Sequence, residues 1–134
     1  MVWVGQHTIN RGQGGRPKTP TNAPAYEPHE FVGEDGTELK YMLLQPLDYD
    51  PEETNPLVLA LHGGGGKTHG ADVLAEDEIR EDFPCFVMAP SAPSPYGWAS
   101  PSRYDYVRPR PGMLPTVFEA LDALMEELSI DPER

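Results

Sequence analysis

The segment Leu57-Val58-Leu59-Ala60-Leu61-His62-Gly63-Gly64-Gly65-Gly66 is an unbroken apolar run that ends in a histidine and four glycines. A run of this length between a proline and glycines predicts a strand at residues 57–61, buried on both faces of a parallel sheet. The glycines let the backbone turn sharply and leave N–H groups that no Cβ covers. At the carboxyl end of a strand, such N–H groups are suited to hold negative charge on a ligand or on a transition state.

The composition fits one soluble domain. The chain has 134 residues, enough for one core and too few for two. Its 22 acidic residues outnumber its 10 basic residues and give a formal charge of −12. Such a surface repels phosphate backbones and anionic lipids, so we expect no nucleic-acid partner and no membrane partner.

The sequence also bears on location and redox chemistry. No stretch approaches the ~18 apolar residues of a membrane span, and the single Cys85 excludes an internal disulfide. The first residues do not form a signal peptide, which makes the cytoplasm the expected location unless a leader precedes Met1.

The segments around residues 57–61 predict further strands and a helix. Residues 31–34 and 37–44 flank Asp35-Gly36, the dipeptide that two-residue hairpin turns prefer, and predict an antiparallel hairpin. Cys85–Ala89 predicts a short strand that Pro90 ends. A helix predicted over 70–81 connects the two apolar strands and indicates parallel pairing through a right-handed crossover. We expect its inner side to carry Val73, Leu74 and Ile79.

The two ends of the chain differ in pattern. Residues 1–28 are rich in glycine and proline and predict a flexible arm, which leaves 29–134 as the domain. Residues 91–114 form a long loop that contains four aromatic side chains. The last predicted helix begins with the capping-box spacing of Thr116 and Glu119. Its apolar stripe comprises Val117, Leu121, Leu124 and Leu128.

The ordered pattern of residues 30–134 resembles the amino-terminal part of an α/β-hydrolase, in the branch of esterases, dienelactone-hydrolase-like proteins and predicted peptidases. The resemblance lies in Pro46–Pro51, Pro56–Gly65, the strand before Pro90, the Trp98 loop and the helix that leads to Ile130–Arg134. It implies an α/β fold with a mostly parallel sheet, an antiparallel hairpin at its start and a truncated C-terminal part. It also implies serine ester hydrolysis as the activity of the complete protein.

The resemblance assigns roles to individual residues. In this family, the loop after the buried strand supplies one N–H of the oxyanion hole. That role falls to Gly64, with Gly65 as the alternate, while His62 and Gly63 shape the loop and His62 is not the catalytic base. The substrate is a small-molecule or polymeric ester, and no cofactor or metal is implied. Tyr96 and Trp98 belong to the substrate wall, although a cover over the core remains an open alternative for them.

The nucleophile motif of the family is missing from the sequence. The family places its serine in G-x-S-x-G after the next strand, followed along the chain by the acid and the histidine. The five serines, none of which lies in that motif, are Ser91, Ser94, Ser100, Ser102 and Ser129. We therefore expect the chain to be the first half of a hydrolase, without a catalytic triad and inactive alone.

Other functions remain as alternatives. Gly66-Lys67-Thr68 resembles the end of the phosphate-binding loop G-x-x-x-x-G-K-[ST], but the first glycine of that loop would fall on Leu61. Nucleotide binding is therefore less favoured. A metal site at His62, His69 and Asp72 is also less favoured, because histidines on a glycine loop are more often ordinary loop residues. The third alternative is a non-catalytic interaction protein derived from a hydrolase.

Overall fold

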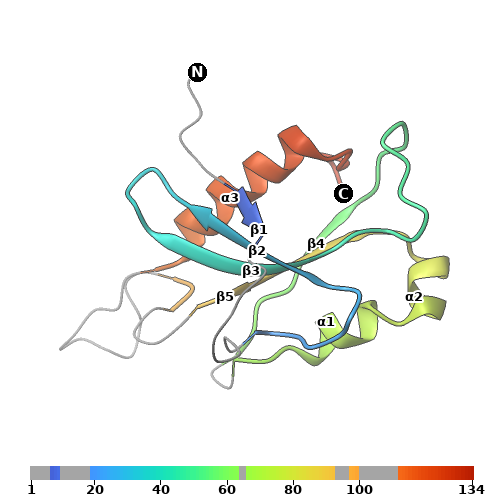
Figure 1. The fold of residues 1–134 in the computed structure, drawn as a ribbon, viewed down its shortest axis with the longest axis horizontal. Helices are drawn as coiled ribbons and strands as arrows, with labels where there is room; N and C mark the ends of the chain where they lie inside the picture. Colours follow the sequence, from blue (N-terminus) through green and yellow to red (C-terminus); the bar gives the residue numbers. More distant parts are fainter. Residues whose placement is uncertain (1–6, 10–18, 64–65, 93–96, 100–111) are drawn as a thin grey trace.

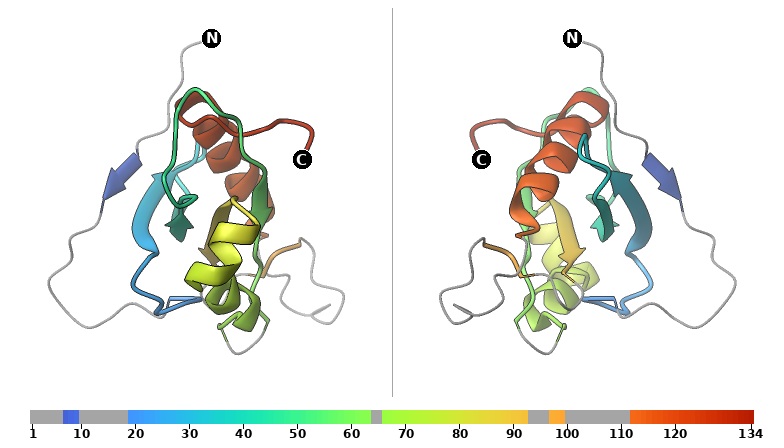
Figure 2. Two further views of the ribbon diagram at one scale, coloured as in Figure 1. Left: turned by 90° about the vertical axis from the view of Figure 1, so that its right-hand side faces the viewer. Right: turned by 90° about the vertical axis from the view of Figure 1, so that its left-hand side faces the viewer.

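A five-stranded sheet lies between two helical layers in the computed structural model (Figure 1). The structure describes residues 7–9, 19–63, 66–92, 97–99 and 112–134. The strands are β1 (His7–Ile9), β2 (Glu27–Val32), β3 (Glu38–Leu44), β4 (Leu57–Leu59) and β5 (Phe86–Ser91). The helices are α1 (His69–Leu74), α2 (Asp77–Asp82) and α3 (Leu114–Glu127). Helix α3 covers one face of the sheet, and α1 and α2 lie toward the other (Figures 1 and 2).

The sheet is mixed, with strand order β1-β2-β3-β5-β4. β4 and β5 pair in parallel, as expected for strands joined by a helical crossover. β1 with β2, β2 with β3 and β3 with β5 all pair antiparallel. The expected α/β class is therefore present, but a mostly parallel sheet is wrong for the described residues.

The burial of β4 differs from the prediction. Its side chains are only partly buried, and that of Val58 keeps 38% of its surface exposed. Leu61, which the predicted strand included, lies two residues after the end of β4 and keeps 39% exposed. β4 lies at the edge of the sheet that the described residues form, whereas β5 lies between β3 and β4. Burial on both faces belongs to β5, where Phe86, Val87 and Met88 have no exposed surface. β5 also continues through Pro90 to Ser91, beyond the predicted end.

The predicted hairpin is present, but its loop is longer than predicted. β2 and β3 pair as far as Val32 and Glu38. The Gly33 N–H donates to the Thr37 carbonyl over 2.9 Å, and the Gly36 N–H donates back to the Gly33 carbonyl over 2.9 Å. Gly36 has φ +85°, a left-handed conformation that suits glycine. The connection is a three-residue loop with a glycine bulge, one of the common alternatives to the two-residue turn.

The main core lies between α3 and the sheet. Phe31, Leu39 and Tyr41 from the hairpin meet Val117 and Leu124 from α3 in one buried cluster. Along the first part of β3, the buried Leu39 and Tyr41 alternate with the exposed Glu38 and Lys40. The capping box is wrong, because α3 begins at Leu114 with a proline in its first turn and no side-chain cap. Glu119 instead accepts a hydrogen bond from the Glu34 N–H, over 2.9 Å, in the hairpin loop.

The predicted helix over 70–81 is two short helices. α1 ends at Leu74 and α2 begins at Asp77. Leu74 packs beside a second buried cluster that includes Ala71, Met42 and Val87, on the face of the sheet opposite α3. Val73, expected on the inner side, keeps 47% of its surface exposed. This second core is thin, because α1 contributes Ala71 as its buried residue and α2 contributes none.

The packed part of the chain begins before residue 29. β2 starts at Glu27, while Thr21 and Tyr26 keep only 2% and 4% of their surface exposed. A flexible arm that reaches residue 28 is therefore wrong for residues 19–28. Composition alone failed here because a few side chains, above all Tyr26, find a buried site on α1 that no local pattern reveals. Residues 1–6 and 10–18 lie outside the described part.

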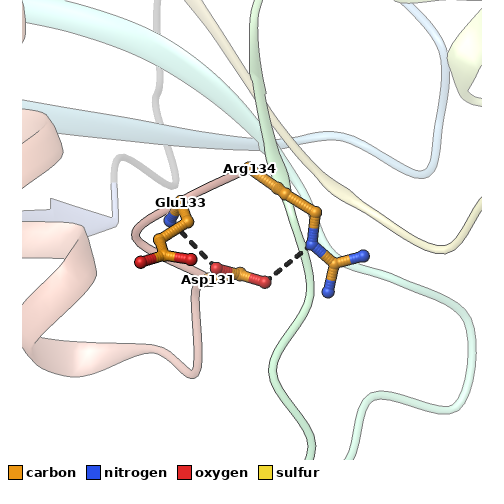
Figure 3. Close-up of polar contacts among 3 residues, drawn as sticks. All are labelled: Asp131, Glu133 and Arg134. Atoms are coloured by element: carbon orange, nitrogen blue, oxygen red, sulfur yellow. Dashed lines mark hydrogen bonds and ion pairs between the residues drawn. The ribbon is translucent and has the colours of Figure 1, made fainter.

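The last residues lie beside the start of β4. Asn55 and Ile130 form a parallel bridge, and the Leu57 N–H donates to the Arg134 carbonyl over 3.3 Å. The Asp131 carboxylate holds the turn at residues 131–134 (Figure 3). It accepts from the Glu133 N–H over 2.9 Å and from Arg134 Nε over 2.8 Å. These contacts, the Glu133 N–H foremost, lower the pKa of Asp131 below its ordinary value.

Candidate functional site

His62 joins the segments that follow β4 and β5. The residue stands three positions after the end of β4, and its ring nitrogen Nε2 accepts a hydrogen bond from the Ala92 N–H over 2.9 Å. Ala92 immediately follows β5. The other ring nitrogen, Nδ1, lies 2.7 Å from the Gly63 carbonyl oxygen. The imidazole therefore ties together the carboxyl ends of two adjacent parallel strands.

These contacts indicate which tautomer the neutral His62 ring adopts. A neutral imidazole carries one N–H, and the nitrogen that accepts from Ala92 carries none. The proton is therefore on Nδ1, which donates to the Gly63 carbonyl. Both nitrogens are used in these bonds, which suits a structural role.

The Gly63 carbonyl is also the start of a tight turn. It accepts a second hydrogen bond from the Gly66 N–H over 3.0 Å. Gly66 has φ +75°, where a side chain is strained. This hydrogen bond joins the first and last glycines of the run, a few residues after the end of β4. Gly64 and Gly65, the predicted oxyanion-hole residues, lie outside the described part of the chain.

Trp98 connects this turn to α3. Its indole Nε1–H donates to the His62 carbonyl over 2.8 Å, and the two rings lie 4.8 Å apart. Its own carbonyl accepts from the Leu114 N–H over 3.0 Å at the first residue of α3. The half-buried indole also packs against the main core. Trp98 is therefore next to the predicted site and also covers the core; Tyr96 lies outside the described residues.

The segment after the turn leads into α1. The Thr68 hydroxyl caps this helix and accepts from the Ala71 N–H over 3.4 Å. The Thr68 N–H donates to the Pro20 carbonyl over 3.1 Å. Lys67, the cation of the alternative phosphate-binding loop, is exposed. His69 and Asp72, suggested with His62 as metal ligands, are also exposed.

Other chemical groups lie away from this site. Across the described ranges, no three His, Cys, Asp or Glu residues are grouped so as to hold a metal ion. Cys85 is buried, and burial raises the pKa of its thiol, as for a small core residue. In the same ranges, no helix has the length and apolar character to cross a membrane.

A groove of about 570 Å³ lies near the amino-terminal ends of β4 and β5, at the end of the strands opposite His62. Acidic side chains dominate its lining: Asp48, Asp50, Glu53, Asp77 and Glu81. The Arg80 guanidinium is held there by the Gln45 carbonyl, 2.9 Å away. The groove is separate from the site at His62.

The sequence did not reveal all the residues at the site. The Ala92 and Leu114 N–H groups are backbone donors, and Pro20 contributes a backbone carbonyl. A backbone group leaves no mark in residue type, so no pattern could have identified these partners. Of the residues predicted for the site, the structure brings His62, Gly63 and Trp98 together.

Comparison with solved structures finds similarity to two esterases. The structure is similar to that of a thermostable esterase, with 31% sequence identity and a TM-score of 0.69. The match covers 81% of this chain and 32% of the esterase, so the chain spans about a third of that protein's length. A CE1 ferulic acid esterase from Anaeromyces mucronatus, in complex with ferulic acid, matches at 17% identity with a TM-score of 0.44. That match covers 92% of this chain and 52% of the ferulic acid esterase. Neither a protein-family model nor a curated protein matches the sequence.

Proposed function

We propose that this chain supplies the oxyanion loop and part of the substrate wall of a serine ester hydrolase, and that the nucleophile, acid and base lie outside these 134 residues. The substrate is a carboxylic ester, either a small molecule or a polymer. In this scheme the chain needs no cofactor or metal. The observation that carries the proposal is the bonding of His62 at the turn after β4.

The His62 ring bears on the direction of the next peptide group. The carbonyl and the N–H of a trans peptide point in opposite directions. Because the Gly63 carbonyl is held toward the ring, the N–H of Gly64 is expected to point away from it. An N–H that is oriented in this way is suited to bind an oxyanion. Gly65 remains the alternate donor.

This arrangement suits acyl transfer. Attack of a serine on an ester carbonyl forms a tetrahedral intermediate with a negative oxygen, collapse releases the alcohol, and water then hydrolyses the acyl-enzyme. A fixed backbone donor lowers the barrier to such steps by ~2.7–4 kcal/mol. Trp98, held at the same place by His62 and α3, provides an apolar wall for the acyl or alcohol group. The 31% identity to a thermostable esterase supports this assignment.

The test compares this chain with a longer one. The first protein is residues 1–134, and we expect it to hydrolyse p-nitrophenyl butyrate no faster than buffer. Turnover by this protein that is lost on replacing one of its own serines would contradict the proposal. The second protein is the product of the reading frame extended past codon 134, in which we expect G-x-S-x-G after an apolar strand.

Variants of the extended protein test the oxyanion donor. Gly64→Pro removes the N–H, and we expect kcat to fall by about 10²–10³ with little change in KM. Gly65→Pro is the matched variant, and the larger fall identifies which residue donates. Unchanged kcat in both variants would exclude the loop as the oxyanion hole. A reading frame that stops at codon 134, with a stable and cooperatively folded product, would favour the interaction-protein alternative.

A further inference from the structure

We propose that residues 20–26, here called the strap, position the loop that follows β4, with Thr21 and Tyr26 as the positioning side chains. This inference rests on the proposed function for its meaning in catalysis. In the structure, the strap holds the C-terminal end of this loop, where the chain enters α1. The strap comes from a part of the chain more than 40 residues away from α1 in sequence.

Helix α1 needs support from outside itself. It has six residues, and isolated helices shorter than ~12–15 residues are marginal in water. Ala71 is its buried residue, so packing on the sheet holds it weakly. The helix begins three residues after Gly66, where the glycine turn ends. Any movement of α1 therefore moves the end of the turn.

The strap bonds to α1 at its cap and first turn. The Pro20 carbonyl accepts from the Thr68 N–H over 3.1 Å. The Tyr26 hydroxyl donates to the Ala71 carbonyl over 2.6 Å, and the Thr21 hydroxyl donates to the Asp72 carboxylate. The strap therefore makes three hydrogen bonds to residues 68–72, which form the N-cap and the first turn of α1.

The strap is itself well anchored. Thr21 and Tyr26 keep only 2% and 4% of their surface exposed, and Ala23 packs beside the core under α1. The Thr21 hydroxyl also accepts from the Ala23 N–H over 3.2 Å, and the Tyr26 N–H donates to the Ala23 carbonyl over 3.1 Å. Burial raises the pKa of Tyr26 above its ordinary value, so its hydroxyl keeps the proton that it donates.

The loop is therefore fixed at its two ends by different parts of the protein. His62 holds the beginning through Gly63, and the strap holds the continuation through Thr68. In the proposed function, holding both ends of the loop reduces the ordering that is required when charge develops on the substrate. The strap is thus a positioning device that acts through α1 and touches no substrate.

Two isosteric variants test the strap in residues 1–134. Tyr26→Phe removes the hydroxyl bond to Ala71, and Thr21→Val removes the bond to Asp72 together with the acceptor of the Ala23 N–H, while both keep the side-chain shape. We expect hydrogen exchange of the Thr68 amide, followed by NMR, to accelerate about fivefold or more in each variant. The amides of β3 and β5 should change far less.

The controls separate local positioning from general destabilisation. Tyr49→Phe removes another tyrosine hydroxyl, which accepts from the Ser129 N–H over 3.0 Å, just after the C-terminal end of α3. It should leave Thr68 exchange unchanged. Thr21→Ser keeps the hydroxyl and should restore wild-type exchange at Thr68. Unchanged Thr68 exchange in both strap variants, or equal acceleration of all amides, would overturn the proposal. Neither outcome depends on ester turnover, so this test can fail independently of the proposed function.

Discussion

At the scale of single residues, His62 makes the contacts on which the candidate site depends. Its ring satisfies the Ala92 N–H and the Gly63 carbonyl, and its own carbonyl satisfies the Trp98 indole. A polar group that loses its partner in a half-buried place costs about 1–3 kcal/mol. His62 is therefore important to stability as well as to loop geometry.

We predict that His62→Phe destabilises the domain by about 1–3 kcal/mol in urea unfolding, because the ring remains beside Trp98 but leaves the Ala92 N–H without an acceptor. His62→Gln, whose amide oxygen reaches the position of Nε2, should recover part of the loss. Nitrogen-15 NMR of the wild-type ring should show the proton on Nδ1. A ring protonated on Nε2, or a Phe variant as stable as wild type, would contradict the assigned bonding.

At the scale of elements, the turn at residues 131–134 is predicted to be sensitive to acid. The pKa of Asp131 is lowered in the folded state by the Glu133 N–H and by Arg134 (Figure 3). A lowered carboxyl pKa means that the folded state binds fewer protons than the unfolded chain. The resulting stability is present above the ordinary pKa of aspartate and is lost as pH falls through the lowered value.

The comparison of wild type with Asp131→Asn measures this effect. The urea midpoint of the variant should lie below that of wild type at neutral pH, and the two should converge in acid. Because Arg134, the charged partner of the half-buried Asp131, is exposed, the difference should be small and should shrink with added salt. A difference that stays constant from neutral to acidic pH would show that the carboxylate charge has no part in it.

At the scale of the whole molecule, β4 is an apolar edge strand of the described sheet, and the last residues of the chain pair with it at its start, through Leu57. Val58 keeps 38% of its surface exposed, and exposed strand edges promote pairing between chains. The formal charge of −12 opposes such contact by repulsion. We therefore predict association of residues 1–134 that increases with salt, measured by light scattering, and that decreases in Val58→Lys.

Val32→Lys is the matched control for this prediction. Val32 is exposed to the same 38%, but it lies in β2, between β1 and β3 in the sheet order. The control should associate as wild type does. Equal loss of association in the two variants would show that added positive charge, rather than the edge of β4, is responsible.

The accuracy of the sequence predictions varied with the range of the interactions. The hairpin, the two parallel strands and the C-terminal helix follow from local apolar periodicity, and each is present. The short hairpin turn, the capping box and the single helix over 70–81 were wrong. Glu119 illustrates the cause, because its partner in the hairpin loop is 85 residues away in sequence. The strap was missed for the same reason.

The sequence by itself determined which segments become strands and helices, and it located the glycine turn after β4. It did so because side-chain volume, β-branching and the conformational freedom of glycine act within a few residues. Only the tertiary structure decided that β5, rather than β4, is buried on both faces, because burial depends on strand order. The tertiary structure also decided that His62 and the strap hold the turn at its two ends, because backbone partners from distant segments leave no pattern in the sequence.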